Sequence, residues 1–534
     1  MKREIIYSDV SPTAAQEASA SMSELQPFSS LTDLITPGSV PTKRWLTCEH
    51  NVTILNGTAE PFEPEGEHLG IWSLVQSDDA RNITVPPLEI TFSGLETSTA
   101  LTLAFDAPTN TFCAELNLKY YRGSTLLFER DFFPNSPTYS CMGTVEFYNK
   151  IIVQFKKLNL PRRFLKLHTV LFGLIRQYGG DELKALRVFE KIDATSQTLP
   201  INSSDFTIQP DEDDELLYQK RQSIEIRFGG ELVAQHYINK AQNYSFSNID
   251  IIGVLDTMGD YLGGVYTGNI SAGELISDIV GGVAEIEIEN GLRDIPIHGW
   301  LPIKKRRDAL AMVQFAIGAI IDTSRSDKIH VFSLTNTVPI GIPVPRTYHA
   351  PTTEFEFPYT GVELIEYRLQ KNQEEKKLFE EETDGSRITV NFRNPVWAGR
   401  IINGTLIENH PNYVVFEGTQ GQITSVMGRE YGLLQVSVMK NNPLITTITE
   451  EKIYSVNNQY LVHQDNSSEI LDRLYNYYLK PRTVSGSIVL DGEKPGDNIM
   501  LNLAHGQPRS GRLEQVELVP GATAIKAGIK FRAD

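Results

Sequence analysis

The stretch Ser223-Ile-Glu-Ile-Arg-Phe-Gly-Gly-Glu-Leu-Val-Ala-Gln-His-Tyr-Ile238 decides the fold class of this chain. Apolar and polar residues alternate on both sides of the Gly229-Gly230 pair, as expected for two strands that each bury one face. Glycine adopts the positive backbone angles that a tight turn between antiparallel strands requires. The stretch therefore predicts a β-hairpin.

The residues before this hairpin repeat the same alternation in short segments. Leu88–Phe92, Leu101–Phe105 and Ile151–Phe155 each alternate apolar and polar side chains, and turn-forming residues separate them. Short alternating strands at roughly 10-residue spacing are typical of a β-sandwich, so we expect one over residues 46–178. Residues 1–45 are rich in Ser, Thr, Ala and Pro without a clean period, and we expect an extended N-terminal arm there.

Three segments carry helical signals. Ser271-Ala-Gly-Glu274 has the pattern of a capping box and opens a predicted helix at 275–280, because the serine and glutamate side chains can each bond a free backbone amide. The segment 306–321 repeats apolar residues at helical spacing and predicts a second helix, and 467–479 predicts a third. For 181–193 we expect a short helix or a connector.

The stretch 338–358, VPIGIPVPRTYHAPTTEFEFP, is rich in proline and predicts an extended crossover between two β regions. The region before it covers residues 179–337, and the region after it covers 359–534. Both alternate apolar and polar residues over several short segments. The predicted fold class is therefore mainly β, with a sandwich, two further β regions and a few inserted helices.

The charge balance limits the kinds of partner. The 534 residues include 67 acidic and 49 basic side chains, a formal net charge of −18. A protein that coats nucleic acid needs a basic surface, so no stable nucleic-acid binding is expected. No stretch approaches the roughly 20 apolar residues that a membrane-spanning helix needs. The N-terminus lacks an apolar leader, and three cysteines are too few for a disulfide framework in a chain of this size. We therefore expect synthesis in a reducing cytoplasm.

The usual catalytic and ligand-binding motifs are missing from the sequence. There is no phosphate-binding loop, no dinucleotide fingerprint, no nucleophile elbow and no His-Glu-x-x-His pattern. We therefore predict no enzymatic activity, no catalytic residue, no cofactor and no metal. The acidic run Asp211–Glu215 reads as a solvated loop. A glycosidase-type pair of carboxylates depends on separation in space, so a cell-wall hydrolase stays open as an alternative.

Lys304-Lys305-Arg306-Arg307 is the one dense basic cluster in the sequence. It precedes the helix predicted at 306–321, and cations at a helix N-terminus oppose the helix dipole, so helix stability does not explain it. The cluster is either a solvated loop that aids solubility or an assembly contact that pairs with an acidic neighbour.

Aromatic side chains gather in the middle of the predicted sandwich: Tyr120, Tyr121, Phe128, Phe132, Phe133 and Tyr139. Exposed rings stack on sugar faces, which favours carbohydrate binding. Aromatic residues that alternate along strands more commonly fill a core. Both interpretations stay open at the level of sequence.

The order of the segments around the hairpin resembles a known family. After the hairpin come Tyr244–Asp256, Gly263-Gly-Val-Tyr266, the capped helix at Glu274 and then Arg307-Asp-Ala-Leu310. This order is similar to the tail hub proteins of tailed bacteriophages and prophages, which include baseplate hub, late control D-type and tail-associated hub proteins. The resemblance covers about 195–335, and it implies that 179–337 and 359–534 each form a hub barrel.

The end of the predicted sandwich carries a second resemblance. Tyr148-Asn149-Lys150, the strand at 151–155, Asn159-Leu-Pro-Arg162 and Phe164–Leu167 look like the last strands of a galactose-binding-like jelly roll. Such domains accompany hub proteins in some prophage tails.

The family resemblance implies a structural role. Hub proteins form homotrimers that adapt the sixfold tail tube to a threefold tip, and they surround the channel for the tape measure protein and DNA during genome ejection and host cell entry. The implied partners are further copies of the chain, a tail tube or distal tail protein, the tape measure protein and a central spike or fibre. The implied location is the virion tail tip or baseplate, after synthesis in the host bacterial cytoplasm. A carbohydrate-binding, receptor-recognising tail protein is the alternative.

Overall fold

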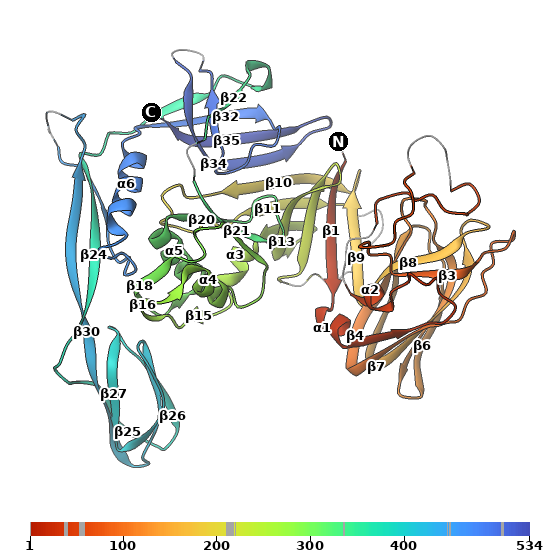
Figure 1. Ribbon diagram of the computed structural model, residues 1–534, viewed down its shortest axis with the longest axis horizontal. Coiled ribbons are helices and arrows are strands. Elements are labelled where there is room, and N and C mark those ends of the chain that lie inside the picture. The colour runs from red at the N-terminus through yellow and green to blue at the C-terminus, as the bar shows by residue number, and fades with distance from the viewer. Residues whose placement is uncertain are drawn as a thin grey trace. The chain divides into compact units, whose positions relative to one another are not determined.

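The computed structural model describes residues 2–36, 41–52, 59–209, 218, 220–334, 337–445, 447, 450–503 and 507–533. The mainly-β prediction is confirmed, with 54% of residues in strands and 10% in helices. The chain divides into two compact units (Figure 1). One unit is Ile6–Gln177, and the other joins Met1–Ile5 to Tyr178–Asp534. The chain passes between them within β1 (Arg3–Val10) and again within β9 (Gly173–Gly179). Within the described residues, no helix is both long and apolar enough to cross a membrane.

The first unit contains a seven-stranded antiparallel sheet. Its strands run in the order β3-β8-β4-β7-β5-β6, and β2 pairs with β4. Their bounds are β2 Ala18–Ser21, β3 Ile71–Gln76, β4 Leu88–Phe105, β5 Cys113–Arg122, β6 Thr125–Phe132, β7 Thr138–Leu158 and β8 Phe164–Leu171. The alternation seen in the sequence places Leu103, Tyr120 and Phe155 in one core cluster, each with at most 1% of its surface exposed.

The first 45 residues differ from the expected extended arm. Besides β1 and β2 they contain α1 (Pro12–Glu17) and α2 (Leu31–Ile35). Ser11 accepts a hydrogen bond from the backbone amide of Ala14, and Ser30 caps α2 in the same way. Ala14 and Leu34 are fully buried in the core of this unit. Two serines of this segment, Ser11 and Ser30, are helix caps, which is a position that serine favours.

A thirteen-stranded sheet dominates the second unit. Its strands run in the order β23-β32-β35-β34-β10-β11-β14-β13-β12-β1-β9. In addition, β33 pairs with β34, and β22 pairs with β33. The remaining bounds are β10 Leu183–Lys191, β11 Ser203–Ile208, β12 Ser223–Phe228, β13 Glu231–Gln242, β14 Ser245–Ile249, β22 Ile340–Ile342, β23 Thr352–Phe355, β32 Arg482–Val489, β33 Asn498–Leu501, β34 Arg509–Pro520 and β35 Ile525–Ala533. Strands from 179–249 and from 482–533 therefore belong to one sheet, so the two predicted β regions are not separate in the way the sequence suggested.

The predicted hairpin is confirmed as β12 and β13, which pair antiparallel with Phe228 opposite Glu231. Gly229 and Gly230 form the turn with φ angles of +63° and +94°. A side chain at both positions would be strained, because L-residues rarely adopt this left-handed region. The acidic run at 211–215 lies outside the described residues.

Residues 181–193 are not a helix or a connector, and this prediction is wrong. They form β10, which lies between β11 and β34 in the middle of the sheet. Leu186 and Val188 point into the core while Arg187 between them is exposed. Pairing on both edges of the strand overrides the helical propensity of its Leu, Ala, Arg and Glu residues.

Three helices pack together between the strands of this unit. They are α3 (Ile251–Leu255), α4 (Ala272–Val280) and α5 (Arg306–Ile317). The predicted capping box is present at α4, because Ser271 and Glu274 each bond the other's backbone amide. The helix predicted to reach residue 321 ends earlier, since Gly318 adopts a left-handed φ of +73° and β20 (Ala319–Asp322) follows.

Short strands frame these helices. β15 (Asp260–Tyr261) pairs with β19 (Lys304–Lys305), and β16 (Gly264–Ser271) pairs with β18 (Pro296–Leu301). β21 (Ile329–Ser333) lies between β20 and the parallel strand β17 (Ile286–Ile288).

The chain from 361 to 478 forms a separate layer of this unit. Two long strands, β24 (Gly361–Lys371) and β30 (Gln422–Asn441), pair antiparallel, and α6 (Ser467–Tyr478) packs beside them (Figure 1). The helix predicted at 467–479 is thus confirmed. The remaining strands are β25 Lys376–Thr383, β26 Arg387–Asn391, β27 Val396–Ile402, β28 Gly404–His410, β29 Tyr413–Gly418 and β31 Ile453–Val456.

The turn between β28 and β29 is tied to β18 by one buried side chain. Asn412 is 2% exposed. Its Oδ1 accepts a hydrogen bond of 2.7 Å from the indole of Trp300, and its Nδ2 donates to the carbonyl oxygens of Leu262 and Leu301 at 2.6 and 2.8 Å. A single asparagine therefore satisfies one donor and two acceptors that would otherwise be buried without partners.

Replacing Asn412 by alanine is expected to lower the free energy of unfolding by about 1–3 kcal/mol or more, because a buried polar group without a partner costs that much. Urea denaturation followed by tryptophan fluorescence would measure the change. Asn391→Ala removes the same amide from an exposed position of β26 and serves as the control. Equal effects of the two substitutions would contradict the anchoring role.

Candidate assembly surface

The crossover at 338–358 exposes more large apolar side chains than any comparable described segment. We call them the crossover stripe, and its members are Val338, Ile340, Val344, Tyr348, Phe355 and Phe357. Val338 is 89% exposed, Phe355 73% and Phe357 87%. Large apolar patches on a folded surface commonly mark sites of protein–protein contact.

The backbone of this segment is held firmly although its side chains are exposed. β23 pairs antiparallel with β32 and is the terminal strand of the large sheet's path, and Thr347 forms a further bridge to Ile488. Arg346 donates hydrogen bonds to the carbonyl oxygen of Val489 at 2.8 Å and to the carboxylate of Glu493 at 2.5 Å. The predicted crossover is therefore an ordered edge of the sheet rather than a linker between domains.

Cationic side chains lie over two of the exposed rings. The Arg482 guanidinium lies 5.3 Å from the centre of the Phe355 ring, and the Lys526 amine lies 5.5 Å from that of Tyr348. Contacts at these distances favour a defined orientation of the rings. The crossover stripe thus joins an apolar edge to cationic groups on β32 and β35.

The predicted basic cluster is Lys304–Arg307, and both of its arginines contact other residues of the chain. Arg306 begins α5, and its Nη1 donates a hydrogen bond to the carbonyl oxygen of Ile279 near the end of α4. Arg307 Nε lies 3.3 Å from Oδ1 of Asp256. A cation at the end of α4 has favourable interactions with free carbonyl groups and with the helix dipole. Lys305 Nζ lies 3.9 Å from Oδ2 of the same Asp256, which is a long ion pair, so Lys304 and Lys305 are the members most available for an external contact.

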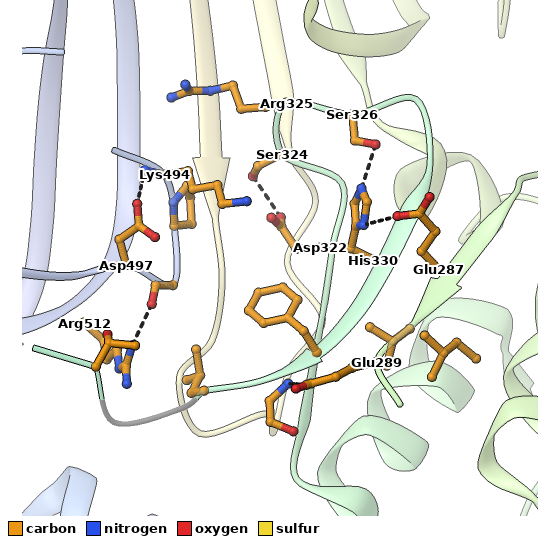
Figure 2. Close-up of a pocket in the computed structure, with 18 of the residues that line it drawn as sticks. Glu287, Glu289, Asp322, Ser324, Arg325, Ser326, His330, Lys494, Asp497 and Arg512 are labelled. Carbon is orange, nitrogen blue, oxygen red and sulfur yellow. Dashed lines mark hydrogen bonds and ion pairs between the residues drawn. The ribbon is translucent and has the colours of Figure 1, made fainter. Parts of the chain in front are cut away.

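A cavity of about 690 Å³ opens between β17, β21 and the loop that precedes β33. Figure 2 shows that its wall mixes acidic groups with cationic and imidazole groups. Its polar residues include Glu287, Glu289, Asp322, Ser324, Arg325, Ser326, His330, Lys494, Asp497 and Arg512. Sequence reasoning missed this site, because its residues come from segments up to 225 positions apart.

Most of the carboxylates around this cavity already hold the backbone or a neighbouring cation. Glu289 accepts a hydrogen bond of 2.6 Å from the amide of Ser333, and Asp497 accepts one of 2.9 Å from the amide of Lys494. Glu287 accepts one of 3.0 Å from Lys328, and this pairing lowers its carboxyl pKa. These contacts explain Glu287, Glu289 and Asp497 as loop supports.

A buried polar network lies behind the cavity. Asp250 caps α3 and accepts hydrogen bonds from the hydroxyl of Thr323 at 2.7 Å and from the amide of Asn202 at 3.0 Å. The Asn202 side chain in turn donates to Asp322 at 3.2 Å and to Ser324. Burial raises the pKa of Asp250 to about 6, since the charged carboxylate is separated from water.

The same network contains a buried ion pair. Arg325 donates to the two carboxylate oxygens of Glu190 at 2.5 and 3.0 Å, and to the carbonyl oxygen of Glu493 at 3.2 Å. Burial raises the pKa of Glu190 to about 7, although Arg325 opposes this change. The pair links β10 to the loop after β20 and to the loop after β32, so it joins early and late parts of the chain.

The aromatic residues named from the sequence separate into two kinds. Tyr120 and Phe132 are buried in the core, and Tyr121, Phe128 and Tyr139 are partly buried. Only Phe133 is largely exposed, at 64%. Phe147, which no sequence pattern indicated, is also exposed, at 52%. The guanidinium of Arg122 lies 5.5 Å from the centre of its ring.

The cysteines and metal-binding groups give no further site. All three cysteines are free. Across the described residues, no three His, Cys, Asp or Glu side chains are grouped so that they could hold a metal ion.

Comparison with solved structures finds tail proteins among the chains with some likeness to this one. No family model matches the chain, and no curated protein matches it by sequence. A tail protein from Neisseria meningitidis MC58 is similar over 67% of this chain and 94% of its own, at 11% identity and a TM-score of 0.40. The 43 kDa tail protein of prophage MuSo2 from Shewanella oneidensis is similar over 67% and 95%, at 8% identity and a TM-score of 0.39. Prophage tail protein gp18 from Listeria monocytogenes EGD-e covers 66% and 91%, at 9% identity and a TM-score of 0.37.

The ion pair of Glu190 predicts a pH dependence of stability. Its folded-state pKa of about 7 lies above the ordinary value of 4.5, so the folded chain binds more protons between these values and loses stability as the pH rises through them. Glu190→Gln should therefore flatten the decline of the unfolding free energy between pH 4.5 and 7. It should not lower stability at pH 7, because the neutral amide avoids the desolvation cost that raises the pKa of Glu190.

Urea denaturation at half-unit pH steps would measure both effects. Glu517→Gln is the control, because Glu517 is 40% exposed on the neighbouring strand β34. Parallel pH profiles of the wild type and Glu190→Gln would rule out this origin of the pH dependence.

Proposed function

We propose that this chain is a structural subunit of a phage or phage-like tail, and that it assembles with copies of itself into a trimeric hub at the tail tip or baseplate. The crossover stripe carries the proposal. Phe355 lies on the edge strand β23 and Ile340 on β22, and the other members lie in the segments next to these strands. A strand edge without a partner and exposed apolar side chains favour association with another chain.

The physical argument starts from the cost of leaving these groups in water. Burying a Val or Phe side chain contributes about 1.5–3 kcal/mol, so several of them on one edge can offset much of the entropy lost on association. The arginine bonds to Val489 and Glu493 hold the segment in place before contact, and this reduces the ordering cost. Preorganised apolar edges of this kind are expected in a subunit rather than in a free monomer.

The hub role adds a symmetry argument to this contact. The order of the hairpin, the capped helix and the Ala-rich helix resembles tail hub proteins, for which a trimer presents six related β regions to a sixfold tail tube. The proposed partners are a tail tube or distal tail protein, the tape measure protein and a central spike or fibre. The proposed location is the virion, and DNA would pass through the ring without stable binding. The role rests on interfaces and needs no catalytic residue or cofactor.

The proposed trimer can be tested with the purified chain. Mass photometry should detect trimers that dissociate on dilution. The triple variant Val344→Ser/Phe355→Ser/Phe357→Ser should weaken the trimer at least tenfold, because its apolar surface no longer gains from burial. Leu95→Ser/Leu127→Ser/Met142→Ser changes three exposed apolar residues of the sandwich and is the matched control.

A monomeric wild-type chain at all concentrations would refute the trimer. The same assay with added tail-tube protein, followed by negative-stain imaging, tests the hub role. It also tests the basic cluster through Lys304→Ser/Lys305→Ser, which leaves the internal contacts of Arg306 and Arg307 intact. Unaltered assembly of this variant would remove the cluster from the interface.

A second candidate function is receptor recognition by the sandwich. It is favoured by the exposure of Phe133 at 64% and Phe147 at 52%, since exposed rings stack on sugar faces. A glycan array should then give a hit that Phe133→Ala or Phe147→Ala abolishes. An array without hits would count against carbohydrate binding and would leave the hub proposal intact.

A further inference from the structure

The large sheet of the second unit has one buried face and one open face. Along β10, Leu186 and Val188 are buried while Arg187 and Lys191 are exposed on the opposite side. The neighbouring strands follow the same alternation, so their outward residues lie on one surface. We call this surface the open face, and its charged members are Arg187, Lys191, Asp205, Lys240, Glu517, Lys526 and Lys530.

The open face is basic although the chain is acidic. Its five basic and two acidic side chains give a net charge of +3, against −18 for the whole chain. Arg187 lies 3.7 Å from Glu517, which is a weak exposed pair. No described carboxylate forms an ion pair with Lys191, Lys240, Lys526 or Lys530. The positive charge of these four lysines is therefore available to an external acidic group.

Two hollows lie on the open face beside β10. Their volumes are about 390 and 510 Å³, and they lie on the two sides of this strand. Serine, threonine and charged side chains line them together with apolar side chains such as Phe206 and Ile529. Acidic side chains of a partner could pair with the lysines and accept hydrogen bonds from the serine hydroxyls.

The chain itself carries an acidic counterpart on β25. Glu380, Glu381 and Glu382 follow one another on this strand, and all three are exposed. β25 pairs only with β30 and lies at an edge of its sheet. Glu381 and Glu382 form no ion pair with a described residue, while Glu380 is bonded to Lys377. Ile423, which lies opposite Glu382, is 57% exposed and adds an apolar contact at the same edge.

We infer that the open face of one copy receives the acidic edge strand β25 of a second copy. This inference rests on the proposed assembly of copies and names the second pair of surfaces in it. Charge complementarity selects the occupant, and continuity with the crossover stripe supports it, since Lys526 of the open face lies against the ring of Tyr348. The two surfaces differ, so the contact is head-to-tail and closes into a ring when the rotation between copies is one third of a turn.

Nucleic acid is a poorer occupant of the same surface. A net charge of +3 spread over six strands gives few phosphate contacts, and the affinity of such binding falls steeply with salt. A second copy instead brings the carboxylates of Glu380 and Glu382, which lie on one face of β25, together with Ile423 opposite Glu382. Reversing the charge on the open face and, separately, on β25 distinguishes a second copy of the chain from nucleic acid as the occupant.

The test is a charge swap measured by mass photometry at 50 and 300 mM salt. Lys526→Glu/Lys530→Glu should weaken the trimer at least tenfold at low salt, and Glu380→Lys/Glu382→Lys should do the same, since each change places like charges together. The chain that carries all four substitutions should recover most of the wild-type affinity, because the opposite charges face each other again. Lys157→Glu/Arg130→Glu on the sandwich changes the net charge equally and is the control.

Failure of the four-fold variant to recover association would overturn the pairing of the open face with β25. Unchanged association of both double variants would overturn it as well. Loss of binding to a 30-base-pair DNA duplex in Lys526→Glu/Lys530→Glu, with unchanged association, would assign the surface to nucleic acid instead. If the double variants keep the trimer but the crossover-stripe variant loses it, the proposed function stands and this inference fails. A monomeric wild type refutes both.

Discussion

The second unit depends on the position of β10 between β11 and β34. This strand pairs with Ser203–Ile208 on one side and with Gln515–Leu518 on the other, so it closes a loop of more than 300 residues. Closing so long a loop has an entropic cost that only extensive burial can offset. Val188 and Leu518, paired across the strands and fully buried, are part of that burial.

The buried polar network follows from this closure. Once β10 and the C-terminal strands lie together, Glu190 is separated from water and needs a cation, which Arg325 supplies. Asp250 and Asn202 likewise satisfy the backbone and hydroxyl groups that the closure buries. These contacts fix which loops lie together more than they add stability, because the cost of removing charges from water offsets much of their attraction. The cavity in Figure 2 is the outer side of the same arrangement.

The proposed functional surfaces lie on the edges and open face of the same sheet. The crossover stripe follows β22, β23 and the segments next to them, and the outward lysines of β10 and β35 form no ion pair with a described residue. An apolar contact supplies most of the affinity between proteins, and complementary charge adds specificity and speed of association. A ring protein needs both, since its copies must associate tightly and in one orientation.

The sequence by itself determined the local elements of this protein. The hairpin at 223–242, the capping box at Ser271 and the helix at 467–478 were predicted correctly, because alternation, turn glycines and caps act between neighbours in the chain. Only the tertiary structure decided that 183–191 is a strand, because its pairing partner β34 lies more than 300 residues away. It also decided that 338–358 is an ordered sheet edge and that the first 45 residues pack into a core. Exposure, edge position and the separation of charges in space depend on contacts between distant segments, and no local pattern records them.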